Sequence, residues 1–138
     1  MEEALLEEHG IRPTAVRLLV VRILAQTDSP LSLSEIEATL DTAPKSTIFR
    51  ALTLFETHKL VHTIEDGSGS LKYELSHHRK SIDDRHPHFF CEACQRTYCI
   101  KEIQIPTIEL PKGFTMHSFN YIIKGICDKC CNKQEEKV

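Results

Sequence analysis

The chain has 138 residues, of which 41% are hydrophobic and 27% are charged, a composition that is ordinary for a folded protein. This composition excludes a disordered chain, a collagen-like repeat and a peptide held by disulfides alone. The length allows one domain or two small ones, and two small domains would each have a thin hydrophobic core in need of a cross-link. Six cysteines and eight histidines could provide one by binding metal.

The net charge of −3 is unevenly distributed along the chain. Residues 1–75 contain seven Lys and Arg against twelve Asp and Glu, whereas residues 76–138 contain ten against eight. The chain therefore lacks the overall basic character that is common in proteins that bind nucleic acids. Any DNA binding must depend on a few locally placed cations.

The N-terminal segment MEEALLEEHG is acidic and lacks the basic start and long apolar stretch of a signal peptide. The longest aliphatic run near it, Leu18–Val21, is far too short to cross a membrane. We therefore expect a cytoplasmic protein without a membrane partner. In a reducing cytoplasm, cysteines spaced as CxxC are more often metal ligands or redox groups than disulfides.

The first half of the chain predicts two helices before residue 41. Apolar residues recur at helical spacing over residues 18–24, and Thr14 precedes them as a good N-cap. A second, shorter helix is expected from Ser32 or Ser34 to Leu40, because a carboxylate in its first turn suits the helix dipole.

A third helix is expected from Lys45 or Ser46 to His58, with an apolar stripe at three- and four-residue intervals. Alternating residues at 61–64 and 71–75 then flank a Gly- and Ser-rich turn and predict a β-hairpin. This order of elements is typical of a winged helix-turn-helix. The same pattern also fits a small helical domain that binds no nucleic acid.

The second half of the chain changes character. A polar segment without apolar periodicity predicts a hinge, and three short β-like runs at 88–91, 97–105 and 115–126 predict a small three-stranded sheet. The expected fold is therefore α+β. Its parts are a winged helix-turn-helix (1–75), a hinge (76–85) and a small β-rich domain (86–138).

Two CxxC motifs, Cys91 with Cys94 and Cys127 with Cys130, form the strongest signal in the sequence. Two residues between thiolates allow a tight turn to direct both sulfurs at one ion, and two such turns complete a tetrahedron around zinc. Cys131 could compete for the fourth position. Buried reduced thiols and a redox-active pair are the alternative interpretations.

A second group of metal-binding side chains precedes the first CxxC motif. His86 and His88 alternate on the expected strand and would share one face, which Cys99 on the next run could also reach. Two imidazoles and a thiolate suit zinc better than ferrous iron. The alternative is that these residues are surface histidines and a buried cysteine.

Glu74 ends the predicted hairpin, and His77 and His78 lie in the predicted hinge. A metal site assembled from the hinge and the second sheet would couple metal binding to the angle between the domains. Such a metal acts as a switch, because it favours the domain arrangement for which it has the higher affinity.

Taken in order, five segments resemble the ferric uptake regulator family of metal-dependent bacterial repressors. They are GIRPTAVR (10–17), STIFRAL (46–52), YEL (73–75), HxHxxCxxC (86–94) and GICDKC (125–130). The resemblance implies an N-terminal winged helix-turn-helix domain that binds DNA (1–75) and a small C-terminal α/β domain for metal binding and dimerisation (86–138), fastened by a four-cysteine zinc. It also implies a homodimer that binds double-stranded, pseudo-palindromic operator DNA when a second, regulatory metal is bound.

The resemblance also implies which residues contact DNA. Arg17, ahead of the predicted first helix, and Arg50 are expected to contact phosphates, and Phe49 stands where the family usually has tyrosine, so that it could pack on thymine methyl groups. The complete set of expected DNA contacts is Arg17, Lys45, Ser46, Thr47, Phe49 and Arg50.

The regulatory site departs from the family pattern at two positions. The chain has Ser29 where the family has a histidine, and Cys99 where it has an acid. We hypothesise that His77 or His78 replaces the missing histidine. The expected regulatory ligands are Glu74, His77, His86, His88 and Cys99.

The sequence therefore predicts a zinc-responsive, DNA-binding repressor that acts as a homodimer and holds one structural and one regulatory Zn²⁺. An iron- or manganese-responsive regulator, with Fe²⁺ or Mn²⁺ at the second site, is the alternative on the same scaffold. A zinc or thiol-redox protein that does not bind DNA is the alternative from another class. An enzyme is not expected, because four cysteines would leave no open position on the zinc for water.

Overall fold

The structure is a computed structural model that describes residues 1–27, 29–76, 87–100, 102–103, 105–106, 108–117 and 119–136. Three predicted ligands or ligand candidates, His77, His78 and His86, lie outside these residues, as does the predicted hinge beyond its first residue. In the part of the chain that is described, no helix has the length and apolar character needed to span a membrane.

Among the described residues, the first part of the chain forms four helices, three of which confirm the predicted ones. They are α1 (Glu2–Glu8), α2 (Ala15–Ala25), α3 (Leu33–Thr39) and α4 (Lys45–Thr57). The Thr14 hydroxyl caps α2 by accepting from the backbone N–H of Arg17 at 3.4 Å. Ser32 and Glu35 form a reciprocal capping box at the start of α3. The helix α1 was not predicted, and it adds the fully buried Leu6 to the core.

The hydrophobic core lies between these helices. The apolar stripe of α4 is buried as the spacing predicted, and it packs with the inner faces of α2 and α3. The largest side chains with no exposed surface in this core are Phe55, Leu6, Ile36, Ile48, Leu52, Leu60, Val20 and Val21. Burial of each such side chain contributes about 1.5–3 kcal/mol to folding.

A three-stranded antiparallel sheet with the order β1-β3-β2 closes this core. Its strands are β1 (Leu31–Ser32), β2 (Val61–Glu65) and β3 (Leu71–Leu75). We call β2, β3 and the turn between them the wing, and α1 to α4 with β1 to β3 the winged-helix part. Because side chains alternate along a strand, Tyr73 enters the helical core while its neighbours Lys72 and Glu74 face the other way.

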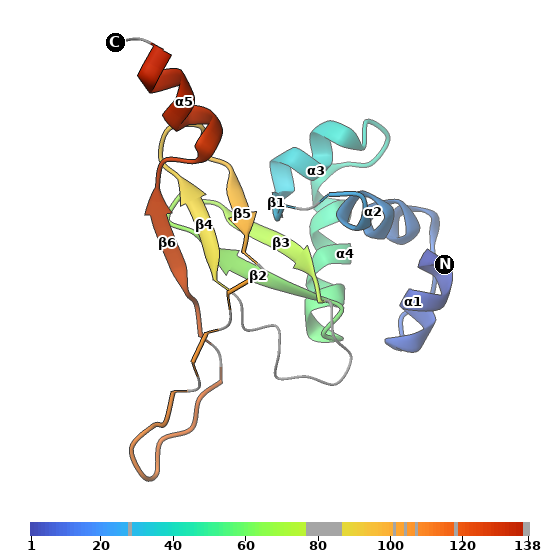
Figure 1. The fold of residues 1–138 in the computed structure, drawn as a ribbon. Helices are drawn as coiled ribbons and strands as arrows, with labels where there is room; N and C mark the ends of the chain where they lie inside the picture. Colours follow the sequence, from blue (N-terminus) through green and yellow to red (C-terminus); the bar gives the residue numbers. More distant parts are fainter. Residues whose placement is uncertain are drawn as a thin grey trace.

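The second sheet has the predicted number of strands, and the predicted run at 88–91 is confirmed, but the runs predicted at 97–105 and 115–126 were too long. It contains β4 (His88–Cys91), β5 (Thr97–Cys99) and β6 (Ile122–Gly125) in the order β5-β4-β6, with β4 antiparallel to β5 and parallel to β6. The segment between β5 and β6 extends away from the sheet as an arm (Figure 1). Its described residues have β-forming composition, but they form no strand because no other segment of the described chain pairs with them.

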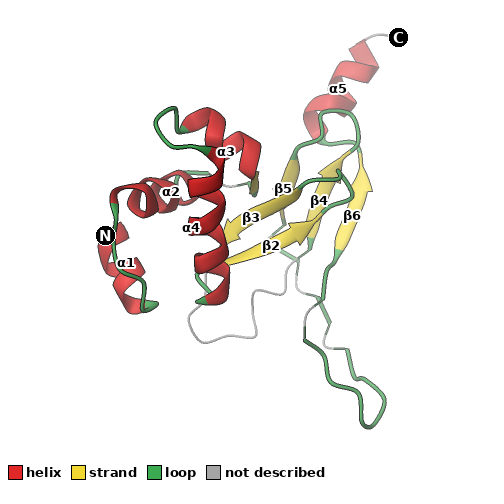
Figure 2. Ribbon diagram, turned by 180° about the vertical axis from the view of Figure 1, so that it is seen from behind, coloured by secondary structure: helices red, strands yellow, loops and turns green. Residues whose placement is uncertain are grey.

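The wing lies between the helices and the second sheet (Figure 2). One face of β3 packs on the helices, and the other face contacts the second sheet through Glu74 and Lys72. A helix that was not predicted, α5 (Asp128–Glu136), follows the second sheet at its far end. The wing is therefore the element through which the two parts of the molecule meet.

Candidate metal centres

Four cysteines gather at one end of the second sheet. Cys91 is the last residue of β4 and pairs with Gly125 at the end of β6, and because these strands are parallel, their CxxC turns begin at the same edge. One sulfur atom from each of Cys91, Cys94, Cys127 and Cys130 lies within 4.8 Å of all the others. The structure therefore brings together the four predicted ligands of the structural metal and leaves the exposed Cys131 outside the group.

Backbone and side-chain donors surround these sulfurs. The backbone N–H groups of Cys94 and Cys127 each donate to the Cys91 sulfur at 3.4 Å, and they lower the pKa of Cys91 to about 6. The Tyr98 hydroxyl donates to Cys127, which lowers the pKa of that thiol and raises the pKa of Tyr98 to about 12. These donors favour the thiolate forms of Cys91 and Cys127, the form that a metal ion requires, whereas the hydrogen bond with Cys127 raises the pKa of Cys130 to about 12 in the absence of an ion. The four-sulfur donor set fits zinc in a closed tetrahedral site.

A second group of metal-binding atoms lies where the wing meets the second sheet. His62 on β2 pairs directly with Glu74 on β3, and His88 on β4 approaches Glu74 from the other sheet. Both imidazoles donate from Nε2 to Oε2 of Glu74, His62 at 3.0 Å and His88 at 2.9 Å. Glu74 and His88 are buried and His62 is half-buried. These donors also lie within 4.8 Å of one another.

The electrostatics of this group favour a carboxylate that is ready to bind a cation. Burial alone would raise the pKa of Glu74, but the hydrogen bonds from His62 and His88 outweigh burial and hold the pKa below its ordinary value. The carboxylate is thus ionised at neutral pH. Two imidazoles and one carboxylate form a donor set that occurs both in zinc sites and in non-haem ferrous sites.

The structure brings together two of the five predicted regulatory ligands. Glu74 and His88 meet, while Cys99, directly opposite His88 in the register of β4 and β5, lies outside the group of atoms within 4.8 Å of one another. His77 and His86 lie outside the described residues. The third member of the group, His62, was missed, because the predicted runs 61–64 and 71–75 pair it with Tyr73, whereas in the structure β2 extends to Glu65 and the register places His62 opposite Glu74.

The predicted DNA contacts lie together on the winged-helix part. Arg17 and Arg50 line one shallow pocket of about 430 Å³ with Thr47, between the first turn of α2 and α4. Arg17 lies inside α2 and not ahead of it, because the helix begins at Ala15, and its guanidinium donates to the Arg12 carbonyl at 2.8 Å. The remaining predicted contacts, Lys45, Ser46 and Phe49, are exposed on the N-terminal half of α4.

This architecture is found in known proteins. The sequence profile described as "Ferric uptake regulator family" matches residues 8–124. The chain belongs to the ferric uptake regulator family. It is therefore a metal-responsive transcriptional regulator and not an enzyme. The family assignment agrees with the two clusters of metal-binding side chains and with the winged-helix fold.

Relatives and solved structures from the ferric uptake regulator family cover almost the whole chain. The ferric uptake regulation protein of Campylobacter jejuni is 26% identical, over 97% of this chain and 88% of the relative. The ferric uptake regulator of Vibrio cholerae has a TM-score of 0.68 at 17% identity, over 92% of this chain and all of that chain. A zinc uptake regulator in complex with zinc and DNA has a TM-score of 0.66 at 19% identity, over 96% of this chain and 92% of that chain. At these identities the structural likenesses establish the fold alone.

Proposed function

We propose that this protein is a zinc-responsive repressor that binds operator DNA as a homodimer when a regulatory Zn²⁺ is bound. The observation that carries the proposal is the His62, Glu74 and His88 group, because its donors come from both sides of the contact between the wing and the second sheet. An ion held there has its full set of donors in one arrangement of the two parts. Its binding therefore favours that arrangement.

The four-cysteine group would hold a structural Zn²⁺. Its four sulfurs would fill the coordination shell, and they join the end of β4 to the end of β6. A zinc ion bound by all four sulfurs would stabilise the second sheet and would have no free coordination position through which it could respond to a signal. The regulatory role accordingly falls to the group with mixed donors.

The identity of the regulatory metal rests on donor chemistry. The two imidazoles and the carboxylate suit zinc, and Cys99, the strand neighbour of His88, offers a thiolate nearby that would favour zinc further. The predicted thiolate does not belong to the group itself, and two histidines with one carboxylate also suit ferrous iron. Iron or manganese is therefore the second candidate, and the name of the Campylobacter jejuni relative agrees with iron.

DNA binding is proposed on the surface around α4. The pocket between Arg17 and Arg50 joins two guanidinium groups to the first turn of α2, where the positive end of the helix dipole favours an anion. A phosphate of the DNA backbone fits this chemistry. Phe49 is half exposed on the same helix and could pack on a thymine methyl group. The acidic excess of residues 1–75 makes binding depend on these few cations.

The homodimer is proposed to form through the second sheet and the arm. The outer strand β6 pairs with β4 on one side only, so that its other edge can accept a strand. The arm and β6 expose large apolar side chains that a second copy would cover, namely Ile103, Ile108, Leu110, Phe114, Met116, Phe119, Tyr121 and Ile123. A cytoplasmic location stays a prediction from the sequence.

Operator binding at one and at two zinc ions per chain tests the proposed switch. We expect high affinity only with two ions, and we expect Glu74→Gln to bind one ion and to keep the low affinity. Arg50→Ala should instead keep both ions and bind DNA about tenfold less tightly, with the slope of log affinity against log salt reduced by about one. Equal DNA affinity at one and two ions would contradict the switch, and restoration by Fe²⁺ or Mn²⁺ but not Zn²⁺ would select the second candidate.

A further inference from the structure

A second polar cluster lies in the contact between the wing and the second sheet, away from the metal-binding groups. It consists of Asp66 at the end of β2, Lys72 on β3 and Thr97 on β5. The exposed fractions of these residues are 1%, 5% and 1%. Charged residues are rarely buried to this extent unless they are paired, so that the partners of Asp66 and Lys72 decide whether this burial is tolerated.

The contacts of this cluster lie partly within the wing, where the backbone N–H of Ser68 donates to Asp66 Oδ1 at 2.9 Å, and partly between the wing and the second sheet. The Lys72 ammonium lies 3.0 Å from Asp66 Oδ2 within the wing, and it donates to the Thr97 hydroxyl at 2.9 Å and to the Gln95 carbonyl at 3.1 Å. The Thr97 hydroxyl in turn donates to Asp66 through a short hydrogen bond. The ammonium also lies 5.5 Å from the centre of the Phe90 ring. The second sheet thus supplies three of the groups that surround a wing cation.

A buried ion pair of this kind specifies an arrangement more than it stabilises one. Removing two charges from water costs as much as their attraction returns, unless further hydrogen bonds satisfy them. Here Thr97 and Gln95 satisfy Lys72 only when β5 lies opposite β3 in the observed position. Any other docking of the two parts would bury the ammonium or the Asp66 carboxylate with fewer partners, which is unfavourable.

The cluster and the mixed-donor metal group are connected through β3 and through the paired strands β4 and β5, in which Thr97 lies opposite Phe90. Lys72 and Glu74 occupy successive positions on one face of β3, as Thr97 and Cys99 do on β5, and Phe90 and His88 do on β4. A strand segment this short moves as one unit. Fixing Lys72 against Thr97 therefore also fixes where Glu74 stands relative to His88.

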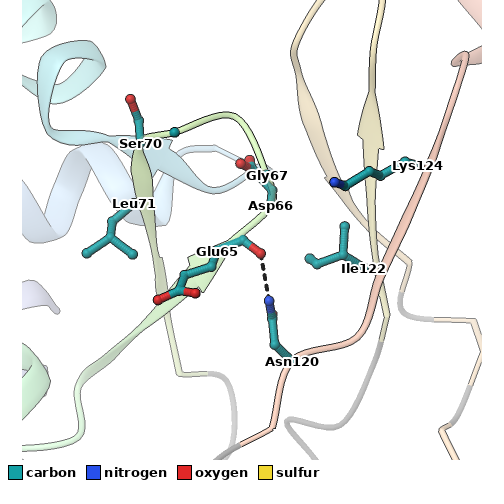
Figure 3. A pocket seen from close by; sticks show the side chains of 9 residues that line it. Glu65, Asp66, Gly67, Ser70, Leu71, Asn120, Ile122 and Lys124 are labelled. Carbon is teal, nitrogen blue, oxygen red and sulfur yellow. Dashed lines mark hydrogen bonds between the residues drawn. The ribbon is translucent and has the colours of Figure 1, made fainter.

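The turn of the wing, next to Asp66, also contacts the second sheet. The Asn120 side chain donates to the Glu65 carbonyl at 2.6 Å, and Lys124 on β6 points toward Gly67, with which it lines a cavity of about 720 Å³ (Figure 3). Gly67 has a φ of 88°, and a Cβ there would lie 2.6 Å from the Lys124 nitrogen. The docked position of the wing thus has contacts that are independent of any metal.

We infer that Asp66, Lys72 and Thr97 are positioning residues of the regulatory metal site. They hold the wing against the second sheet in the one arrangement in which Glu74 meets His88, and they do so before the ion binds. The inference rests on the proposed function, because it takes His62, Glu74 and His88 as the regulatory ligands. Without these residues, the regulatory site would be assembled only in the fraction of molecules in which the wing is docked on the second sheet. The apparent affinity for the ion would then equal the intrinsic affinity multiplied by that fraction.

Thr97→Val tests the inference, with Thr97→Ser as its matched control. Valine keeps the shape and removes the hydroxyl, whereas serine keeps the hydroxyl. The full chain, with its four-cysteine site loaded, is titrated with Zn²⁺ against a chelator. We expect the second Zn²⁺ to bind about tenfold more weakly to Thr97→Val, and about as tightly to Thr97→Ser as to the unchanged chain. The first Zn²⁺ should bind equally to all three.

The outcomes separate the two proposals. If the unchanged chain binds no second Zn²⁺, or binds it without a change in DNA affinity, the proposed function fails and so does the inference. If the unchanged chain binds it and Thr97→Val binds it equally well, only the inference is overturned. A loss of both ions from Thr97→Val would indicate a general structural role and would also overturn it. If Thr97→Val does not fold, Lys72→Met serves as the second variant. We expect the backbone amides of the wing to exchange hydrogen faster in metal-free Lys72→Met than in the metal-free unchanged chain. Equal exchange rates would overturn the inference.

Discussion

The winged-helix part and the second sheet are stabilised in different ways. In the described residues, fifteen buried hydrophobic side chains from α1 to α4, β2, β3 and the loops that join them form one continuous core. The second sheet buries only a few, and four of its sulfur atoms lie close enough to hold one ion. The first part can therefore fold by burying apolar surface, whereas the second part, with few buried apolar side chains among the described residues, would depend on an ion in the four-cysteine group and on its contact with the wing. This difference can be tested by removing one source of stability at a time.

Loss of the structural metal should have the largest effect, and it should affect only one part. Cys127→Ser removes one of the four sulfur ligands, and structural zinc sites contribute about 10–16 kcal/mol of apparent binding free energy to folding. We expect β4 to β6 to lose protection from hydrogen exchange while α2 and α4 keep theirs. The control Cys131→Ser changes an exposed thiol outside the group and should retain the zinc. Equal loss of protection in both parts would contradict the proposed difference.

A cavity in the helical core should have the opposite effect. Phe55 has no exposed surface, and Phe55→Ala should lower the free energy of unfolding of the winged-helix part by about 3–5 kcal/mol. Denaturation followed by far-ultraviolet circular dichroism measures this change, and zinc content should remain at one structural ion. Phe49→Ala, at a half-exposed position, should change stability by no more than about 0.5 kcal/mol. Zinc loss on Phe55→Ala would show that the two parts unfold together.

The smallest expected effect depends on pH and concerns the contact between the two parts. Burial would raise the pKa of Asp66, but hydrogen bonds from Ser68, Thr97 and Lys72 lower it from 3.8 to about 2. A lowered pKa in the folded state stabilises the fold above the ordinary pKa, and this contribution is lost as the pH falls through about 2. In the metal-free chain, Asp66→Asn should thus cost about 1–3 kcal/mol near neutral pH and progressively less below pH 3.8. A difference that stays constant down to pH 2 would contradict this.

The elements that could be predicted from the sequence are those whose signals are local. Thr14 caps α2, the stripe of α4 is buried, and the hairpin forms around its Gly- and Ser-rich turn, because caps, helical periodicity and turn chemistry each act over a few residues. The four-cysteine group was predicted for the same reason, since each CxxC turn directs two sulfurs by itself.

The elements that could not be predicted depend on distant partners. The strand expected at 97–105 ends at Cys99, and the strand expected at 115–126 begins only at Ile122, because composition indicates a strand but does not provide its neighbour. The short acidic helix α1 exists because the core covers Leu6. His62 was overlooked because a histidine in a hairpin has no metal-binding signal until the register places it opposite Glu74. The regulatory group is thus partly a property of strand pairing.

The position of His62 on the hairpin also sets the order in which the chain acquires its metal ligands. Twelve positions separate His62 from Glu74, and fourteen separate Glu74 from His88, whereas Cys91 and Cys127 are thirty-six apart. Hairpins form in about 1–10 μs, far faster than a ribosome adds one residue. The hairpin can therefore bring His62 and Glu74 together early, whereas His88 joins them on β4, which pairs with β6 (Ile122–Gly125) directly before Cys127. The regulatory and structural groups are thus completed within the same short stretch of the chain.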